Sequence, residues 1–105
     1  MAAGIAAGHA VLQRAEPRID SRVKSSPPEV KLYFSERLEP AYSSVRVVDD
    51  RGQHVDRGDG RVDRNNPVLL RATLPPLRRG TYRVKWRVLS IDADVTEGDF
   101  TFSVE

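Results

Sequence analysis

The stretch TYRVKWRV, residues 81–88, alternates side chains of opposite character along its whole length. Tyr82, Val84 and Trp86 fall on one face of an extended chain and the basic side chains between them on the other, because successive residues of a strand point to opposite sides. A period of two over this length predicts a half-buried strand. The stretch follows Gly80, and a tyrosine that enters a strand directly after such a turn anchors the corner of sandwich domains through its hydroxyl.

The same alternation recurs in segments 30–34, 68–74 and 100–104, which we also predict to be strands. Groups of Gly, Pro, Asn, Asp and Ser, typical of turns, lie between them at residues 25–28, 49–52, 58–60, 65–67 and 75–76. Short strands at this spacing indicate a β-sandwich or barrel. We predict an all-β sandwich of about seven strands, with a core that contains Phe34, Tyr82, Val84, Trp86, Phe100 and Phe102.

Length and composition limit the classes of function. A chain of 105 residues that is 39% hydrophobic forms one domain, which we place at residues 9–105, and can fold without staples. Its net charge is only +2 and its basic residues are dispersed, so nucleic-acid binding is not expected. Cysteine is absent, which excludes disulfides and thiolate metal ligands. No apolar run approaches the roughly 18 residues of a membrane span.

The first eight residues, MAAGIAAG, are small, apolar and uncharged. They are similar to the end of a signal peptide, and a cut after Gly8, with Ala6 at the other small position, satisfies the small-x-small rule of cleavage. Such a cut would leave His9 as the first residue of an exported protein. A flexible leader is the other interpretation of residues 1–8.

Five motifs follow one another along the chain from His9 to Val104. They are His9-Ala10, Glu16-Pro17, SPPEVKL at 26–32 followed by FSE at 34–36, LxxGxYxVxW at 77–86, and SxDxxxTEGxFxF at 90–102. Together they resemble the CopC family of periplasmic copper-binding proteins. The resemblance implies a Greek-key, Ig-like β-sandwich that holds Cu(II) through an amino-terminal histidine, an aspartate in the late loop, and a histidine two residues after that aspartate.

Two of these implied ligand positions match, at His9 and Asp92, and the third holds Asp94 in place of histidine. An amino-terminal histidine chelates a metal through its amine and its ring, and Cu(II) leads the divalent series at nitrogen and oxygen donors. Asp92 and Asp94 are two residues apart, which on an extended segment places both carboxylates on one side. We predict a Cu(II) site at His9, Asp92 and Asp94, weaker or less selective than one with a second imidazole.

Other metal chemistry finds less support in the sequence. A calcium loop of the EF-hand type is not expected, because the flanking helices and the full set of ligands are missing. A Cu(I) site needs thioether ligands, and the only methionine is Met1, so His54 is interpreted as an exposed loop histidine. The chain also has no Ser/His/Asp set, no phosphate-binding glycine loop and no paired histidines, so we do not expect an enzyme.

Two functions remain open at this point. In the first, a monomer binds copper ion in the periplasm and exchanges it with an inner-membrane copper transport protein, as the resemblance implies. In the second, the domain has lost its metal and serves as an Ig-like interaction module for a membrane partner, and the acidic loop only keeps its hairpin soluble. Binding of Cu(II) by a protein that begins at His9 distinguishes the two.

Overall fold

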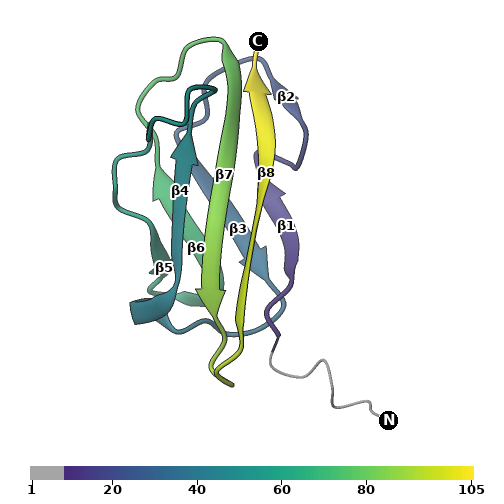
Figure 1. The fold of residues 1–105 in the computed structure, drawn as a ribbon, viewed down its shortest axis with the longest axis vertical. Coiled ribbons are helices and arrows are strands. Elements are labelled where there is room, and N and C mark those ends of the chain that lie inside the picture. Colours follow the sequence, from purple (N-terminus) through teal and green to yellow (C-terminus); the bar gives the residue numbers. More distant parts are fainter. Residues whose placement is uncertain (1–8) are drawn as a thin grey trace.

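The structure is a computed structural model and describes residues 9–105. Eight strands form two sheets packed face to face (Figure 1). One sheet has the order β1-β3-β6-β5, with β1 at Leu12–Glu16, β3 at Glu29–Phe34, β6 at Asn66–Thr73 and β5 at Arg61–Asp63. The other has the order β2-β8-β7-β4, with β2 at Arg22–Val23, β8 at Val95–Val104, β7 at Gly80–Leu89 and β4 at Ser44–Val48. A single turn of 3₁₀ helix, η2, spans Pro40–Tyr42 before β4.

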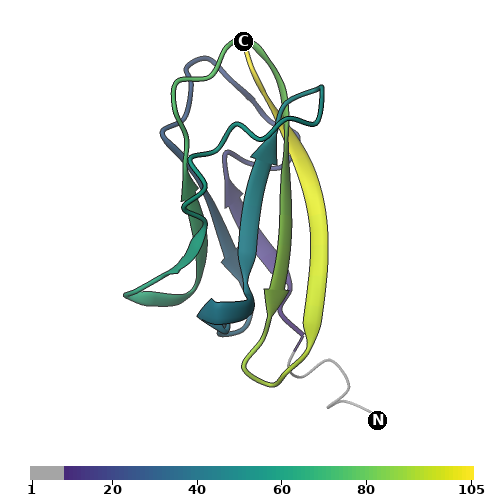
Figure 2. The same ribbon diagram turned by 60° about the vertical axis from the view of Figure 1, so that its left-hand side comes forward.

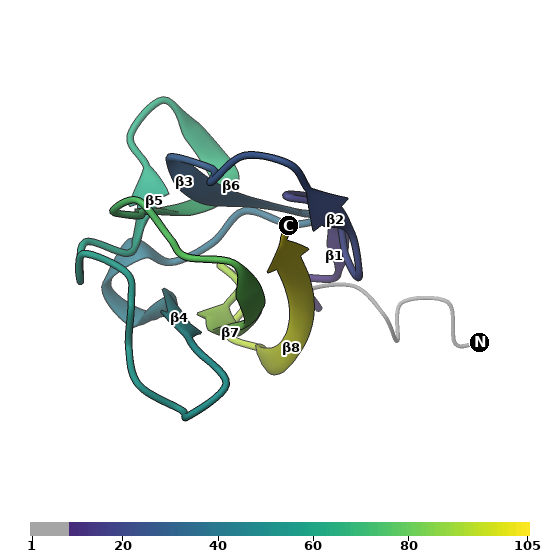
Figure 3. The same cartoon turned by 90° about the horizontal axis from the view of Figure 1, so that it is seen from above.

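The connections are those of a Greek-key sandwich. Only β5–β6 and β7–β8 follow each other within one sheet, and every other connection crosses between the two layers, which are separated in side view and from above (Figures 2 and 3). All pairs are antiparallel except β2 with β8, where Arg22 lies opposite Ser103. The all-β sandwich predicted from the sequence is confirmed. The two-residue strand β2 was not predicted, because it is too short to show an alternation of apolar and polar side chains.

The core lies between the inner faces of the two sheets. Of the predicted core residues, Phe34, Tyr82, Val84, Phe100 and Phe102 are at most 6% exposed. Trp86 is only partly buried, but it packs against the core, with its ring edge-on to Phe34 at a centroid distance of 5.1 Å. Gly98 lies opposite Trp86 in the β7–β8 ladder, and a Cβ at that position would be 2.7 Å from Trp86 Cζ2. The indole therefore needs a residue without a side chain there.

The predicted tyrosine corner is present at the start of β7. The Tyr82 hydroxyl donates a hydrogen bond to the carbonyl of Arg78 at 2.7 Å, which ties the strand to the preceding turn. Burial raises the pKa of Tyr82 above its ordinary value of 10.0, and the nearby carboxylate of Asp49 adds to the rise.

The outer edge of β4 is covered by the chain that follows it. The N–H of Val55 donates to the carbonyl of Val47, and the N–H of Val47 donates to the Asp56 carboxylate at 2.8 Å. The same carboxylate accepts hydrogen bonds from Arg46 and from the N–H of Gly58, and the Asp56 side chain is 0% exposed. Because free strand edges recruit other strands, this arrangement closes one edge of the second sheet.

Candidate metal centre

The candidate metal centre lies at the end of the sandwich where β7 turns into β8 and where β1 begins (Figures 1 and 2). There the structure brings together two of the three predicted ligands, since Nε2 of His9 is 3.9 Å from Oδ2 of Asp94. The two side chains are 51% and 40% exposed. At this distance and exposure even an ion pair would contribute little to the stability of the fold, so the two side chains could bind a metal at little cost in stability.

The segment that carries His9 is fastened to both sheets. Thr96 of β8 donates its hydroxyl to the carbonyl of Ala10 at 2.9 Å, and the Ala10 side chain is buried. Ser35, directly after β3, accepts the N–H of Val11 at 2.9 Å and donates to the carbonyl of His9 at 3.4 Å. The N–H of Ser35 also donates to the carbonyl of Val11. The three residues before β1, residues 9–11, are thus held in place by hydrogen bonds to their main-chain groups.

The loop between β7 and β8 is a closed turn. The carbonyl of Ser90 accepts the N–H of Ala93 at 2.8 Å, and the N–H of Ser90 donates to the carbonyl of Asp94 at 3.0 Å. The hydroxyl of the fully buried Ser90 also accepts the N–H of Asp94 at 3.3 Å. Ala93 has a φ of 70°, in the left-handed region that residues other than glycine rarely occupy. The turn is therefore held by Ser90 from within.

This geometry corrects one premise of the sequence analysis. Asp92 and Asp94 do not lie on an extended segment, because the turn at Ala93 separates them. Asp94 sits beside His9, whereas Asp92 is exposed, and its carboxylate makes no hydrogen bond or ion pair within residues 9–105. The structure thus places His9 with Asp94 and leaves Asp92 to one side of the pair.

The donors present can be compared with what Cu(II) requires. Within residues 9–105, no three His, Cys, Asp or Glu side chains are grouped closely enough to hold a metal ion. His9 and Asp94 supply one imidazole and one carboxylate, and a free amine on His9 would make a third donor. Two nitrogens and one oxygen fit Cu(II); the two side chains alone do not. The ring nitrogen near Asp94 is Nε2, whereas Nδ1 is the one that chelates together with the amine, so for Asp94 to bind the same ion the half-exposed ring would have to turn.

Other carboxylates of the sandwich have structural partners. Asp59 accepts the hydroxyl of Thr73 at 2.6 Å and its N–H at 2.8 Å, and these hydrogen bonds lower the pKa of Asp59 below 3.8. Asp63 accepts Arg71 at 2.7 Å, and this hydrogen bond lowers the pKa of Asp63. Glu29 also accepts a hydrogen bond from this guanidinium, and the bonds to Asp63 and then to Glu29 raise the pKa of Arg71. None of these groups lies beside a histidine.

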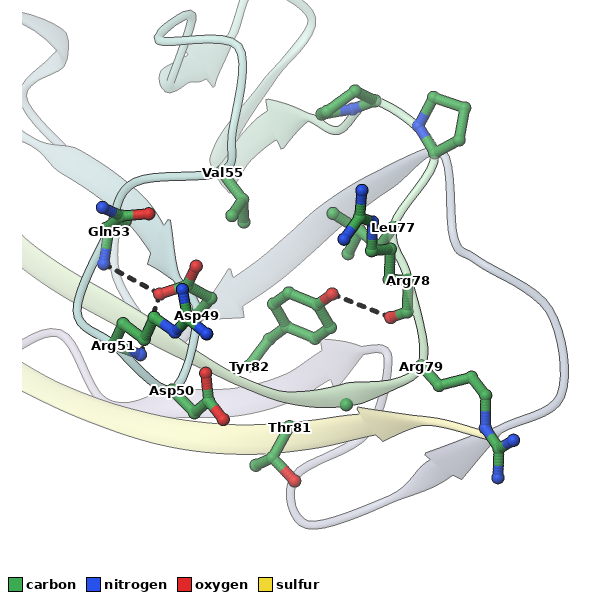
Figure 4. A pocket seen from close by; sticks show the side chains of 13 residues that line it. Asp49, Asp50, Arg51, Gln53, Val55, Leu77, Arg78, Arg79, Thr81 and Tyr82 are labelled. Atoms are coloured by element: carbon green, nitrogen blue, oxygen red, sulfur yellow. Dashed lines mark hydrogen bonds between the residues drawn. The ribbon is translucent and has the colours of Figure 1, made fainter.

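A cleft of about 620 Å³ occupies the opposite end of the sandwich (Figure 4). It lies between the turn at residues 49–53 and the loop at residues 75–81, with Tyr82 between them. Asp49, one of the two aspartates that line the cleft, accepts hydrogen bonds within its own turn, since its Oδ1 accepts the N–H groups of Arg51 and Gln53, both at 2.9 Å. None of the predicted metal ligands lines this cleft, and His54, exposed as expected, is not among its lining residues either.

The sequence analysis missed the contacts that hold the site together. Ser35 and Thr96 both lie inside the motifs that carried the family resemblance, but nothing in their pattern assigned them a role. Their partners are 24 and 86 residues away along the chain. Signal cleavage after Gly8 falls outside the described residues, so processing remains a proposal. No helix in residues 9–105 has the length and apolarity needed to cross a membrane.

The fold and this end of the sandwich define a β-sandwich protein with a histidine and a carboxylate paired beside a hairpin. The family model described as the CopC domain matches residues 12–105, and the chain belongs to the CopC family. Among solved structures, CopC from Methylosinus trichosporium OB3b superposes with a TM-score of 0.82 and 38% identity, over 92% of this chain and 94% of that one.

Two protein sequences extend the comparison. Protein YobA of Escherichia coli (strain K12) is 30% identical over 98 residues, which cover 92% of this chain and 79% of YobA. Copper transport protein CutJ of Bacillus subtilis (strain 168) is 27% identical over 97 residues, which cover 91% of this chain and 18% of CutJ. Family membership and these relatives give the chain a copper-related function.

Proposed function

We propose that this chain is a periplasmic protein that binds Cu(II) beside the β7–β8 hairpin and delivers it. The proposal is carried by one observation: His9 and Asp94 lie 3.9 Å apart, on segments fixed to each other by the bond from Thr96 to Ala10. The copper-related function of the family supports it.

Each predicted ligand has a distinct part in the proposed site. After removal of residues 1–8, the amine and the imidazole of His9 would chelate the ion, and Asp94 would supply a carboxylate oxygen. Asp92, which is exposed and precedes the turn residue Ala93, would add a second oxygen. A carboxylate is a harder donor than the imidazole it replaces, so we expect weaker binding than at a site with two histidines.

The exposure of the pair suits a cargo rather than a permanently held cofactor. Both side chains are at least 40% exposed, so an acceptor can approach them without unfolding of the sandwich. We propose that the acceptor is an inner-membrane copper transport protein and that the chain acts as a monomer. The similarity to a segment of CutJ, a copper transport protein, supports a partner of this class. The proposed activity is binding and delivery, without catalysis.

Titration calorimetry with Cu(II) on two forms of the protein tests the proposal. The form that begins at His9 should bind one ion, and affinity should rise with pH through the neutral range, because an amine with an ordinary pKa of about 7.7–8.0 must lose its proton. The form that keeps residues 1–8 should bind at least about tenfold more weakly, a difference of about 1.4 kcal/mol. Equal affinity of the two forms would exclude the amine as a ligand.

Two observations favour a second function, an Ig-like interaction module without metal. Within residues 9–105 no three His, Cys, Asp or Glu side chains lie close enough together to hold a metal ion. Asp94 also occupies the position where the family resemblance implies a histidine. If the protein that begins at His9 shows no electron paramagnetic resonance signal with Cu(II) while its Asp94→His variant acquires one, this second function replaces the first.

A further inference from the structure

Two hydroxyl groups hold the segment that carries His9, and they come from opposite sheets. Ser35 follows β3 in the first sheet, and Thr96 lies near the start of β8 in the second. Ser35 bonds the peptide groups on either side of Ala10, through the carbonyl of His9 and the N–H of Val11. Thr96 bonds the carbonyl of Ala10 itself. Residues 9–11 are therefore fixed from both sides before β1 starts at Leu12.

Such contacts matter because a chain end is otherwise mobile. In a protein that begins at His9, only three residues would precede β1, and terminal residues fray unless hydrogen bonds or burial restrain them. Ordering a residue costs conformational entropy, and metal binding would otherwise have to offset that cost. The two hydroxyls, together with the buried Ala10 side chain, offset that cost before the ion arrives.

We propose that Ser35 and Thr96 are positioning residues that preorganise the amino-terminal chelate by holding residues 9–11 against the β7–β8 hairpin. The inference rests on the proposed Cu(II) site. Neither hydroxyl is a ligand: both act on main-chain groups, and the bond from Thr96 reaches from the strand that directly follows Asp94. Thr96 thus links the two halves of the site, since Asp94 and Thr96 are two residues apart on one chain and Ala10 adjoins His9.

Ser35→Ala and Thr96→Val remove the hydroxyls with little change of volume. Two hydroxyl controls lie away from the site: Ser26, which accepts the N–H of Leu77 at 2.7 Å, and Thr101, which donates to Asp20 from the same strand as Thr96. Ser26→Ala and Thr101→Val should lower stability by a similar amount and leave residues 9–11 untouched. Thr96→Ser restores the hydroxyl and should restore the wild-type behaviour.

The first readout needs no metal. Amide hydrogen exchange of Val11, whose N–H donates to Ser35, should accelerate about tenfold in Ser35→Ala. It should also accelerate in Thr96→Val, although Thr96 does not bond that amide, if the two hydroxyls hold one segment. Unchanged exchange in both variants would overturn the proposal whatever the copper result.

The second readout is Cu(II) affinity of the form that begins at His9. Each site variant should bind about tenfold more weakly, as is usual when groups that orient a metal ligand are lost, while the two controls and Thr96→Ser keep wild-type affinity. Equal loss in the control variants would reduce the hydroxyls to a general structural role. If the wild-type form binds no Cu(II), the proposed function fails, and the positioning role fails with it even where exchange shows that the segment is held.

Discussion

Two groups of aspartates in this sandwich differ in what already occupies them. Asp56 and Asp59 lie in the connection between β4 and β5, where main-chain N–H groups and the side chains of Arg46 and Thr73 take up their oxygens. The side chains of Asp92 and Asp94, in the β7–β8 turn, accept no hydrogen bond within the described residues. Only Asp94 has a side chain of opposite or potential positive charge near it, since its Oδ2 is 3.9 Å from Nε2 of His9. The contrast is between carboxylates whose oxygens are taken up by the fold and carboxylates that accept no hydrogen bond, one of which lies beside a histidine.

This difference shows why counting acidic residues is a poor guide to a metal site. A carboxylate that already accepts several hydrogen bonds has few acceptor sites left for a metal, and each buried donor that a metal displaced from it would cost about 1–3 kcal/mol. An exposed carboxylate gives up only water. The acids of the β7–β8 turn are therefore the better candidates, although the β4–β5 connection is just as rich in aspartate.

The largest expected effect is on stability, when an aspartate of the β4–β5 connection that already accepts hydrogen bonds is replaced. Asp56→Ala would leave the N–H groups of Val47 and Gly58 and the Arg46 guanidinium without their acceptor, so we expect the free energy of unfolding to fall by about 3 kcal/mol. Urea denaturation followed by Trp86 fluorescence measures this loss. Asp56→Asn keeps one carbonyl oxygen and should lose less. Asp92→Ala, the exposed control, should change stability by no more than about 0.5 kcal/mol.

Substitutions of Asp92 and Asp94 in the β7–β8 turn should change Cu(II) affinity more than stability. In protein that begins at His9, Asp94→His adds a nitrogen donor and should tighten Cu(II) binding about tenfold, or about 1.4 kcal/mol. Asp94→Ala should weaken binding, and Asp92→Ala should weaken it less because, of the two, only Asp94 is paired with His9 in the structure. Titration calorimetry gives the affinities and electron paramagnetic resonance the donor atoms. A larger loss for Asp92→Ala than for Asp94→Ala would mean that the turn rearranges around the ion.

The smallest effect concerns acid stability. Because hydrogen bonds from Thr73 lower the folded-state pKa of Asp59 below 3.8, this carboxylate stabilises the fold above about pH 4, and the contribution is lost as the pH falls through the lowered pKa. Asp59→Asn should therefore flatten the dependence of unfolding free energy on pH below about 4, by less than about 1 kcal/mol for a side chain 40% exposed. Thr73→Val removes the hydroxyl donor but keeps the N–H that also bonds Asp59, so it should flatten the same part of the curve less than Asp59→Asn does.

Most of the fold could be predicted from the sequence, because the alternation of a strand is a local pattern. The stretch at residues 81–88 showed which side chains of β7 face inward, and Tyr82, Val84 and Val88 are buried as expected. Trp86 is less buried than its place in the alternation suggests, although its ring packs over Gly98 and against Phe34. The two-residue β2 is too short to leave any pattern.

The candidate site could be predicted only in part, and through family resemblance rather than periodicity. The order of the motifs placed His9 and the 90–98 loop in one site, but the shape of that loop depends on Ala93 adopting a left-handed conformation. Alanine gives no sign of such a conformation, whereas glycine would. The hydroxyl contacts of Ser35 and Thr96 join distant parts of the chain, so no local pattern records them.

The length of β8 also determines how the domain can be presented to a partner. Its ten residues start at the hairpin beside Asp94 and run to Val104, and an extended strand of that length spans roughly 30 Å. Glu105 thus lies at the far end of the long axis from His9 (Figure 1). A fluorophore, resin or carrier protein attached through Glu105 would leave the end with the proposed Cu(II) site pointing away from the attachment. Handover could then be watched on a surface with the domain tethered in one orientation.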